Sequence, residues 1–353
     1  MYTLHTNKIL TCPQCKKQFE DKYPHYKVRG TSVCSAQCWN TYDPKDNPME
    51  IIIKPEALDL SGVKEGEGGS LYRPQTFDEY VGQTQAKERV KDYIQGCQKF
   101  NETFPHTFLS APSGCGKTTF ALILSTMLNK KFVSLTAQEI RTEQQMINKI
   151  IECEGGIIFL DEAHRISTKV GTFLLPILED FKIQDKKIKQ FTMFMASTHK
   201  GNISKNLDAL MQRFLPINLT HYEISELITI TKNYHKQKYM SVSVPENVFS
   251  EIAANCRRTP RIALALLKEY VFTLNWERVL KNNHIVQNGL TENDFKILNY
   301  IDRNGGAGKA SLAKYLRVEP NTYEYEIEPY LMYLELLTVD NKRKLTQQGK
   351  DLI

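Results

Sequence analysis

Residues 107–119, TFLSAPSGCGKTT, are the stretch that decides the fold. The apolar start predicts a strand, and the FALIL that follows at residues 120–124 predicts a helix. A glycine-rich loop between a strand and a helix turns its backbone N–H groups around phosphate oxygens, at the positive end of the helix dipole. We therefore predict a nucleotide-binding loop made of Ala111, Pro112, Ser113, Gly114, Cys115, Gly116, Lys117, Thr118 and Thr119.

Three positions of this loop carry specific expectations. Lys117 is placed to reach the β- and γ-phosphates, and Thr118 offers a hydroxyl to Mg²⁺. Loops of this kind usually begin with glycine, but here that position is Ala111. Because alanine is strained only where φ is positive, we expect a slightly tightened loop that still binds nucleotide.

A second segment, IIFLDE at residues 157–162, completes the expected chemistry. Its apolar run predicts a buried strand of a parallel sheet. At the end of that strand, Asp161 can hold Mg²⁺, and Glu162 can orient and deprotonate an attacking water. An acidic loop after a strand is common by itself, but both segments in this order indicate binding and hydrolysis of ATP.

Length and composition fit an enzyme of several domains. The chain has 353 residues, of which 41% are hydrophobic and 24% charged, so two or three domains with buried cores are expected. Neither a run of the ~20 apolar residues that span a membrane nor a signal peptide is visible. We therefore expect a cytoplasmic protein, nucleoid-associated or in the host cytoplasm if viral, with no membrane partner. The net charge of +6 permits nucleic-acid binding without demonstrating it.

Half of the eight cysteines form two close pairs near the N-terminus. In a reducing compartment, such pairs separated by a loop of this length suit a tetrahedral Zn²⁺ site. The first 45 residues hold few large apolar side chains other than aromatics, so we expect the metal to stabilise their fold. The sequence thus predicts a zinc-binding module at residues 1–45 with a structural role, whose ligands are Cys12, Cys15, Cys34 and Cys38.

The remaining chain divides by composition and periodicity. Residues 46–70 are rich in proline and glycine and predict a linker. Alternating strand and helix patterns at residues 71–219 predict an α/β domain with a parallel sheet. Residues 220–287 predict a helical domain, with helices at 224–238, 245–256 and 260–272. Short helices and then two short strands, at 335–339 and 344–346, predict a winged helix over residues 288–353.

The predicted winged helix is not basic overall, because residues 291–353 hold nine Lys/Arg and ten Asp/Glu. Carboxylates repel phosphates, so its third helix is a poor fit to a DNA major groove, since it carries Glu324, Glu326 and Glu328. The turn between the two strands is more suitable for phosphates or a minor groove. A solvated turn is the alternative to the predicted DNA contact, which consists of Lys342, Arg343 and Lys344.

Six segments in a fixed order resemble those of the AAA+ ATPases, most closely the RuvB family of Holliday-junction branch-migration motors. They are residues 71–83, 161–165, 195–198, 210–214, 258–263 and 328–331. The resemblance implies a P-loop ATPase domain at 71–219, a helical lid at 220–287 and a C-terminal winged-helix DNA-binding domain at 288–353. It also implies ATP and Mg²⁺ as cofactors and branched or duplex DNA as the partner.

The resemblance also implies roles for single residues, each of which alone would be an ordinary polar or charged side chain. Thr198 is the polar residue of the sensor 1 strand, and Arg261 is the sensor 2 arginine that faces the γ-phosphate. Arg213 is the arginine finger, which acts on the ATP of a neighbouring subunit and therefore implies a homo-oligomeric ring, a hexamer. The remaining expected nucleotide-binding residues are Arg73, Tyr80 and Tyr222.

Met211 and His199 stand where the family usually has arginines, and Ala111 stands where it has glycine. Two larger departures from the family pattern limit what can be carried over. The predicted zinc module has no counterpart in RuvB. The stretch from Lys182 to Gln190 leaves room only for a short hairpin, whereas RuvB carries a longer hairpin there that engages RuvA, the junction-binding partner. This second departure puts a RuvA-type partner in doubt. The lysines of the short hairpin are a second candidate contact, toward the pore or a partner.

The residues therefore support two functions. The first is an ATP-hydrolysing ring motor that acts on DNA by RuvB-like branch migration or by translocation. The alternative is an ATP-switched loader or recruitment factor on DNA in replication, recombination or transposition, with the zinc module binding an unknown protein partner. An inactive structural relative is disfavoured, because all residues expected for ATP chemistry are present.

Overall fold

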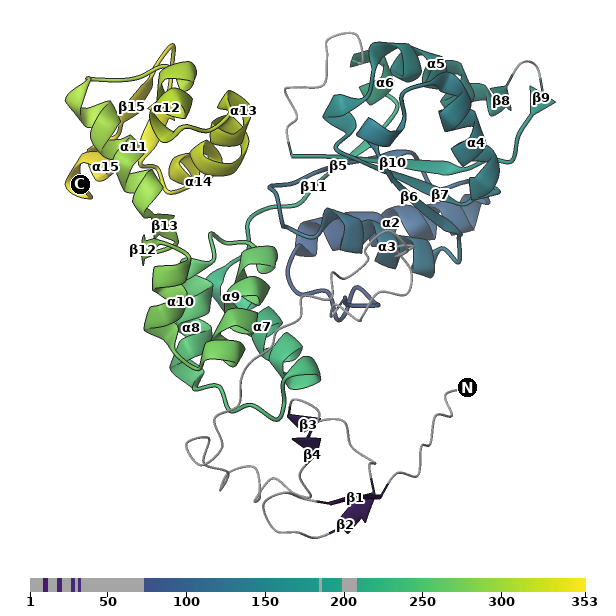
Figure 1. Cartoon of the computed structure of the whole chain (residues 1–353). Coiled ribbons are helices and arrows are strands. Elements are labelled where there is room, and N and C mark those ends of the chain that lie inside the picture. The colour runs from purple at the N-terminus through teal and green to yellow at the C-terminus, as the bar shows by residue number, and fades with distance from the viewer. Residues whose placement is uncertain are drawn as a thin grey trace. The chain divides into compact units, whose positions relative to one another are not determined.

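A computed structural model describes residues 9–11, 18–20, 27–28, 31–32, 73–183, 186–198 and 208–353. The chain divides into two compact units, Met1–Gly69 and Ser70–Ile353 (Figure 1). Within the described part of the chain, no helix has both the length and the apolar character needed to cross a membrane.

The described residues of the first unit form two short antiparallel pairs of strands. β1 (Ile9–Thr11) pairs with β2 (Gln18–Glu20), and β3 (Lys27–Val28) pairs with β4 (Thr31–Ser32). The predicted linker at residues 46–70 lies outside the described residues. The same holds for the four predicted zinc ligands, Cys12, Cys15, Cys34 and Cys38.

In the second unit, the described residues include one sheet of five parallel strands in the order β11-β5-β10-β7-β6. The strands are β5 (Thr107–Ser110), β6 (Phe132–Thr136), β7 (Ile157–Asp161), β10 (Thr192–Ser197) and β11 (Leu215–Asn218). β10 lies between β5 and β7, the two strands predicted from the glycine-rich loop and the acidic segment. Because parallel strands present their carboxyl ends at one edge, the sheet brings those two segments together.

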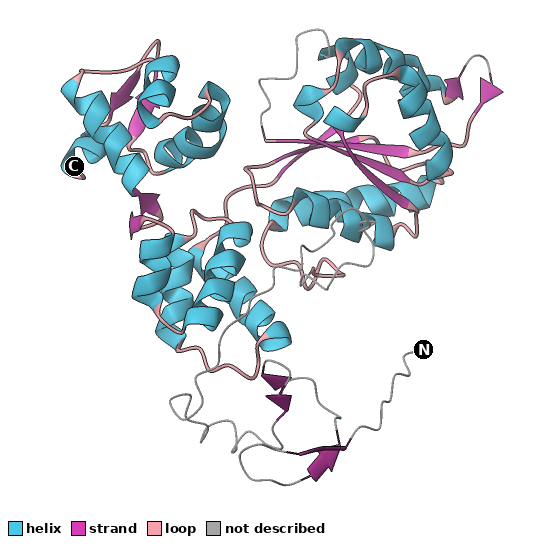
Figure 2. Ribbon diagram, viewed as in Figure 1, coloured by secondary structure: helices cyan, strands magenta, loops and turns pink. Residues whose placement is uncertain are grey.

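Helices cover both faces of this sheet (Figure 2). On one face lie α2 (Thr84–Phe100) and α3 (Lys117–Met127), and on the other lie α4 (Glu143–Cys153), α5 (Thr168–Asp180) and α6 (Asp208–Met211). Two 3₁₀ turns, η3 (Ala137–Glu139) and η4 (Ala163–Arg165), follow β6 and β7. Phe159 packs into the core on the first face, and Ile158 and Leu160 pack into the core on the second. Burial on both faces explains the continuous apolar run of β7.

A short hairpin stands between α5 and β10, as the sequence predicts. β8 (Lys182–Ile183) and β9 (Lys186–Lys187) are antiparallel strands of two residues each. Ile183 packs against the core of the second face, whereas the lysines of both strands are exposed.

The predicted helical lid follows the sheet. It contains α7 (Ile224–Lys238), α8 (Glu246–Asn255), α9 (Pro260–Thr273) and α10 (Trp276–Asn282). The bounds of α7 are those predicted. Those of α8 differ by one residue at each end, and those of α9 differ by one residue at its C-terminal end. Pro260 is the first residue of α9, a position where proline loses no hydrogen bond and its fixed φ suits the helix.

The C-terminal domain has its own core and is a winged helix. It begins with β12 (Ile285–Gln287) and β13 (Leu290–Thr291), followed by α11 (Glu292–Arg303) and α12 (Lys309–Leu316). The third helical segment consists of α13 (Pro320–Thr322), a π-helical turn η6 (Tyr323–Ile327) and α14 (Glu328–Tyr333). The wing is β14 (Leu337–Val339) and β15 (Arg343–Leu345), and α15 (Gln347–Asp351) ends the domain.

The wing corrects two predictions. β14 is shorter than predicted, because Glu335 has a φ of 54°, a left-handed conformation that does not continue a strand. Arg343 was predicted to lie on the turn as a DNA contact, but it begins β15 and forms a two-pronged ion pair with Glu328. Its Nε and Nη2 lie 2.7 and 3.1 Å from the Glu328 carboxylate oxygens, and the two side chains are 12% and 8% exposed. Arg343 therefore stabilises the wing and is not free for DNA.

Candidate nucleotide-binding site

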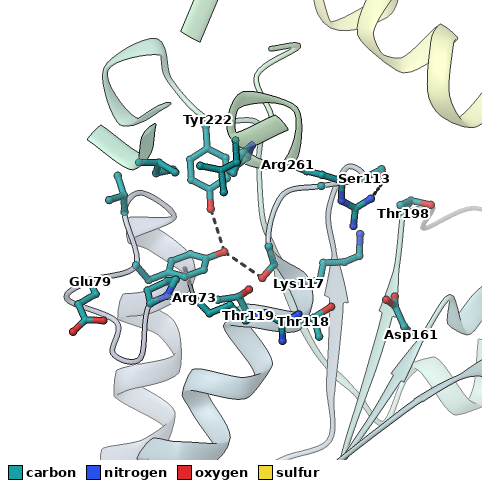
Figure 3. Close-up of a pocket in the computed structure, with 18 of the residues that line it drawn as sticks. Arg73, Glu79, Ser113, Lys117, Thr118, Thr119, Asp161, Thr198, Tyr222 and Arg261 are labelled. Atoms are coloured by element: carbon teal, nitrogen blue, oxygen red, sulfur yellow. Dashed lines mark hydrogen bonds between the residues drawn. The ribbon is translucent and has the colours of Figure 1, made fainter. Parts of the chain in front are cut away.

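A cavity of about 330 Å³ lies where the carboxyl ends of β5, β10 and β7 meet the lid (Figure 3). It gathers most of the residues that the sequence predicts for nucleotide binding and hydrolysis. Those that line it are Arg73, Tyr80, Ser113, Gly114, Gly116, Lys117, Thr118, Thr119, Asp161, Glu162, Thr198, Tyr222 and Arg261.

The loop after β5 requires glycine at two positions. Gly114 and Gly116 have φ angles of 79° and 86°, in the left-handed region that strains residues with a Cβ. Space is also limiting. A Cβ on Gly114 would lie 3.0 Å from Arg261 Cβ, and one on Gly116 would lie 2.6 Å from the Tyr80 hydroxyl oxygen.

Lys117 is a buried cation at this loop, with 9% of its surface exposed. Its ammonium donates to the carbonyl oxygens of Ala111 at 3.1 Å and Pro112 at 3.4 Å. Burial lowers the pKa of Lys117 from its ordinary value, and the nearby Asp161 carboxylate opposes that shift. A desolvated cation with only neutral backbone acceptors favours an anionic ligand such as phosphate.

Three predicted residues shape the loop without lining the cavity. Ala111 is buried, donates its N–H to the Ser197 carbonyl at 3.2 Å, and has a backbone outside the left-handed region. Alanine therefore replaces the usual glycine without strain, and the expected tightening is not needed. Pro112 supplies a carbonyl to Lys117. Cys115 is fully buried, and burial raises the pKa of its thiol to about 12, so it acts as a small apolar spacer.

The acidic pair at the end of β7 faces the same cavity. The N–H of Glu162 donates to the Asp161 carboxylate at 2.8 Å, which fixes that carboxylate. Glu162 has a φ of 50°, a left-handed strain of the kind that is common at functional sites. Its Oε2 lies 3.3 Å from Arg165 Nε, yet 43% of the side chain is exposed, so water reaches the carboxylate.

The donor set fits a Mg²⁺ ion. The Thr118 hydroxyl and the Asp161 carboxylate both line the cavity beside Lys117. Hydroxyl and carboxylate oxygens, completed by water and phosphate oxygens, are the ligands that Mg²⁺ prefers in phosphoryl-transfer sites.

The end of β10 is held against the turn that follows the acidic pair. His164 Nδ1 lies 3.2 Å from the Ser197 hydroxyl, and burial lowers the pKa of His164, so its ring is neutral near pH 7. Thr198, the predicted sensor, follows directly and lines the cavity. The sequence did not single out His164 as a site residue, because a histidine in a loop gives no signal of its own.

Two tyrosines tie the start of the lid to the loop. The Tyr222 hydroxyl donates to the Tyr80 hydroxyl oxygen at 3.1 Å. The Tyr80 hydroxyl in turn lies 3.3 and 3.4 Å from the carbonyl oxygens of Cys115 and Gly116, to which it donates. Burial raises the pKa of both phenols, that of Tyr222 to about 12. Both tyrosines therefore line the cavity and also position the phosphate loop.

Arg261 reaches the site from the lid, where it lies in the first turn of α9. Its Nη1 donates to the Ser113 hydroxyl at 3.3 Å. Figure 3 shows Arg261, Lys117, Thr198 and Asp161 around one space, with Arg261 coming from the lid and the others from the sheet domain. The guanidinium is thus placed to contact phosphate groups bound in the loop.

Sequence reasoning missed the apolar wall of the cavity. Besides Glu79 and His164, the unpredicted lining residues are Pro74, Val81, Ile230, Pro260 and Leu264. Beside the two tyrosines, such a wall suits a purine base. Ile230 and Leu264 occupy apolar positions of amphipathic helices, and nothing in the periodicity distinguishes a ligand-facing position from a core position.

Arg213 follows α6 and is not among the residues that line this cavity. Its Nε and Nη2 lie 2.7 and 2.5 Å from Glu179 Oε1 at the end of α5. On the wing, Lys342 and Lys344 are exposed, unlike Arg343. In the part of the chain that the structure describes, no cluster of three or more His, Cys, Asp or Glu residues could hold a metal ion.

Comparison with known proteins agrees with this geometry. The family model described as the P-loop domain of the Holliday junction DNA helicase RuvB matches residues 72–217. The model of the RuvB C-terminal winged helix domain matches residues 287–353.

Similar full-length proteins match across both regions. The Holliday junction branch migration complex subunit RuvB of Ureaplasma parvum serovar 3 is 31% identical over 303 residues, covering 80% of this chain and 96% of that protein. RuvB of Nitratiruptor sp. is 31% identical over 317 residues, covering 81% of this chain and 92% of that protein. A solved structure of the Thermotoga maritima RuvB Holliday junction branch migration motor is 29% identical, with a TM-score of 0.71. It covers 79% of this chain and 97% of that one.

The geometry of the loop yields a first prediction. We expect Gly116→Ala to lower ATP affinity at least about tenfold, because a left-handed residue with a Cβ costs ~1–2 kcal/mol. The added Cβ would also lie 2.6 Å from the Tyr80 hydroxyl oxygen. ATP affinity is measured by titration with a fluorescent ATP analogue.

Gly96→Ala is the matched control, because a Cβ at Gly96 in α2 meets no atom within 4 Å. This control should bind ATP as the unmodified protein does. Combining Gly116→Ala with Tyr80→Phe removes the clashing oxygen and should recover part of the affinity. Unchanged ATP affinity in Gly116→Ala alone would contradict this description of the loop.

Proposed function

The chain belongs to the RuvB family of AAA+ ATPases, and on that premise we propose that it is an ATP-hydrolysing motor that drives branch migration of four-way DNA junctions. The observation that carries the proposal is the cavity at the carboxyl edge of the sheet. It combines a phosphate loop, an acidic pair and a lid arginine, and a winged helix follows in the same chain. A cytoplasmic location is part of this proposal.

The residues of the cavity divide the work of hydrolysis. Lys117 and the loop N–H groups neutralise and hold the β- and γ-phosphates, and Thr118 and Asp161 would hold Mg²⁺, which screens the phosphate charge. Glu162 orients the attacking water and accepts its proton. Thr198 contacts the γ-phosphate from the end of β10, and Arg261 contacts it from the lid. Loss of that phosphate therefore removes a contact from both domains.

The position of Arg213 supports a ring. Its guanidinium is held by Glu179 and does not line the cavity of its own chain. An arginine finger in this position serves the ATP of a neighbouring subunit, and head-to-tail contacts of that kind close into a ring. We infer a homo-oligomeric ring, a hexamer, whose ATP sites lie between subunits.

Two lysines of the wing are the proposed DNA contact. Lys342 and Lys344 are exposed beside the turn, whereas Arg343 is engaged by Glu328. In the third helical segment, Glu324 Oε2 lies 2.8 Å from Lys309 Nζ, so this lysine compensates part of the negative charge of the segment. The acidic character of that segment still favours contact through the wing.

The partner of this motor differs from that of RuvB in our proposal. The hairpin between α5 and β10 has strands of only two residues and exposes lysines. That hairpin offers little apolar surface to a RuvA-type partner, which is therefore doubtful. The N-terminal unit is the candidate site for another, unidentified protein partner.

A second function is favoured by the same short hairpin together with the added N-terminal unit. In this alternative, ATP binding assembles the ring on DNA as a loader or recruitment factor for replication, recombination or transposition. Such a loader requires ATP binding and release but no strand movement.

One experiment separates the two functions. ATP turnover and strand exchange are measured on duplex, single-stranded and four-way DNA. The unmodified protein should be stimulated most by the four-way junction and should convert it to products. Lys117→Ala should lose turnover and junction movement together. Lys342→Ala/Lys344→Ala should weaken junction binding while keeping basal turnover. The loss of affinity should be largest at low salt and smaller at higher salt, because the variant makes fewer phosphate contacts.

The Glu162→Gln variant separates ATP binding from ATP hydrolysis. It should bind ATP and assemble on DNA but move no junction. If the unmodified protein also assembles on DNA and hydrolyses ATP without ever moving a junction, the motor proposal is wrong and the loader stands.

We also propose that Cys12, Cys15, Cys34 and Cys38 hold one structural Zn²⁺. In the sequence, the first pair lies between β1 and β2 and the second pair follows β4, which suits two hairpins joined by one metal. Purified protein should contain about one Zn²⁺ per chain, and Cys12→Ser should lower that content. Metal analysis that finds no Zn²⁺, or no loss in Cys12→Ser, overturns this proposal.

A further inference from the structure

The segment from Arg257 to Arg261 joins α8 to α9 and contacts separate parts of the chain. At its end, Arg261 donates to Ser113 of the phosphate loop at 3.3 Å. In its middle, the Arg258 carbonyl accepts the N–H of Tyr222 at 3.1 Å. The nucleotide site thus has two connections to this short segment, through Ser113 and through Tyr222.

Arg257, at the start of the same segment, points to the winged-helix domain. Its Nε donates to the Gly289 carbonyl at 3.0 Å, and its Nη1 donates to the Glu326 carbonyl at 3.3 Å. Its Nη2 forms an ion pair with Asp294 at the start of α11. The guanidinium carbon also lies 5.1 Å from the centre of the Tyr330 ring. One side chain therefore binds the β12–β13 turn, α11, the π-helical turn and α14.

This ion pair is shielded from water. Arg257 is 16% exposed and Asp294 is fully buried. The same Asp294 oxygen accepts the N–H and hydroxyl of Thr291, at 2.6 and 2.7 Å, and so caps α11. A buried pair whose hydrogen bonds fix its geometry resists sliding or rotation, because breaking it leaves an uncompensated charge away from water.

The backbone at this junction is equally constrained. Arg257 and Arg258 have φ angles of 51° and 57°, a left-handed strain that persists only where neighbours impose it. Asn255 Oδ1 accepts the N–H of Gly289 at 3.1 Å. A Cβ at Gly289 would lie only 3.1 Å from the Arg257 nitrogen, so the β12–β13 turn sits directly on the end of α8.

From these contacts we propose that Arg257 is the positioning residue that couples the winged-helix domain to the lid, so that both move as one body when the nucleotide moves Arg261. The inference rests on the proposed motor function. Only four positions along the chain separate Arg261, which contacts the phosphate loop, from Arg257, which contacts the winged-helix domain. A rotation of α9 that follows phosphate loss is therefore transmitted to α11 and the wing.

A purely structural role for the pair would affect folding but not the coupling between ATP and DNA. The two roles are separated with Arg257→Gln, Asp294→Asn and the double variant, which leaves no unpaired buried charge. Arg278→Gln is the matched control, because Arg278 is an exposed lid arginine on α10. Arg257→Lys is the conservative variant, which keeps the charge but not the planar fork.

The first readout is geometric and needs no motor activity. Spin labels introduced by unnatural amino acids at Lys236 of α7 and Lys350 of α15, both exposed, report the distance between lid and winged helix. In the unmodified protein we expect one narrow distance distribution that is the same with ADP and with a non-hydrolysable ATP analogue. The double variant should give a broad distribution, and the Arg278→Gln control a narrow one.

The second readout is activity. In the double variant we expect basal ATP turnover within about twofold of the unmodified protein and junction movement lowered about tenfold, the size expected for a lost coupling contact. Junction movement by Arg257→Lys should lie between that of the double variant and that of the unmodified protein. A narrow distribution in the double variant overturns the proposal, as does basal turnover that falls in step with junction movement. If the unmodified protein moves no junction, the motor function fails, but the distance measurement still decides the coupling.

Discussion

The contact between the lid and the phosphate loop organises the nucleotide site: Arg261 donates to Ser113, and Tyr222 reaches the loop through Tyr80. Neither domain alone makes a complete site. The sheet supplies Lys117 and the acidic pair, and the lid supplies Arg261 and part of the apolar wall. A nucleotide bound in the cavity would contact both domains at once. The winged-helix domain is attached to the lid through Arg257, so its position follows the position of the lid.

Much of the fold and of the ATP site was predictable from local sequence. The two segments that flank β10 carry strong signals, because a phosphate loop needs Gly114 and Gly116 and a doubly covered strand needs a continuous apolar run. The helix at residues 224–238 was predicted with its observed bounds, since its apolar spacing is regular. Because the strands are parallel and β10 lies between β5 and β7, the phosphate loop and the acidic pair meet at the carboxyl edge of the sheet.

The features that sequence could not provide depend on distant contacts. Arg343 looked like a free cation in a basic run, and only the fold places Glu328 against it. Ala111 looked like a defect in the loop, and only the observed backbone shows that this position does not need glycine. Part of the apolar wall of the cavity, Ile230 and Leu264, comes from helix positions that look like core positions in the sequence. Arg257 likewise carries no signal in the sequence that sets it apart from Arg258 and Arg261, although it is bound by four parts of the winged-helix domain.

In the ring that we propose, each ATP site is completed by Arg213 of a neighbouring subunit. The most direct measurement mixes two inactive variants, Glu162→Gln, which lacks the base, and Arg213→Ala, which lacks the finger. If the finger acts between subunits, random mixing restores about a quarter of the sites, and ATP turnover should reappear in that proportion. Glu179→Ala, which removes one partner of Arg213 and leaves the guanidinium in place, should keep turnover by itself. A mixture that stays as inactive as its two components would contradict the account.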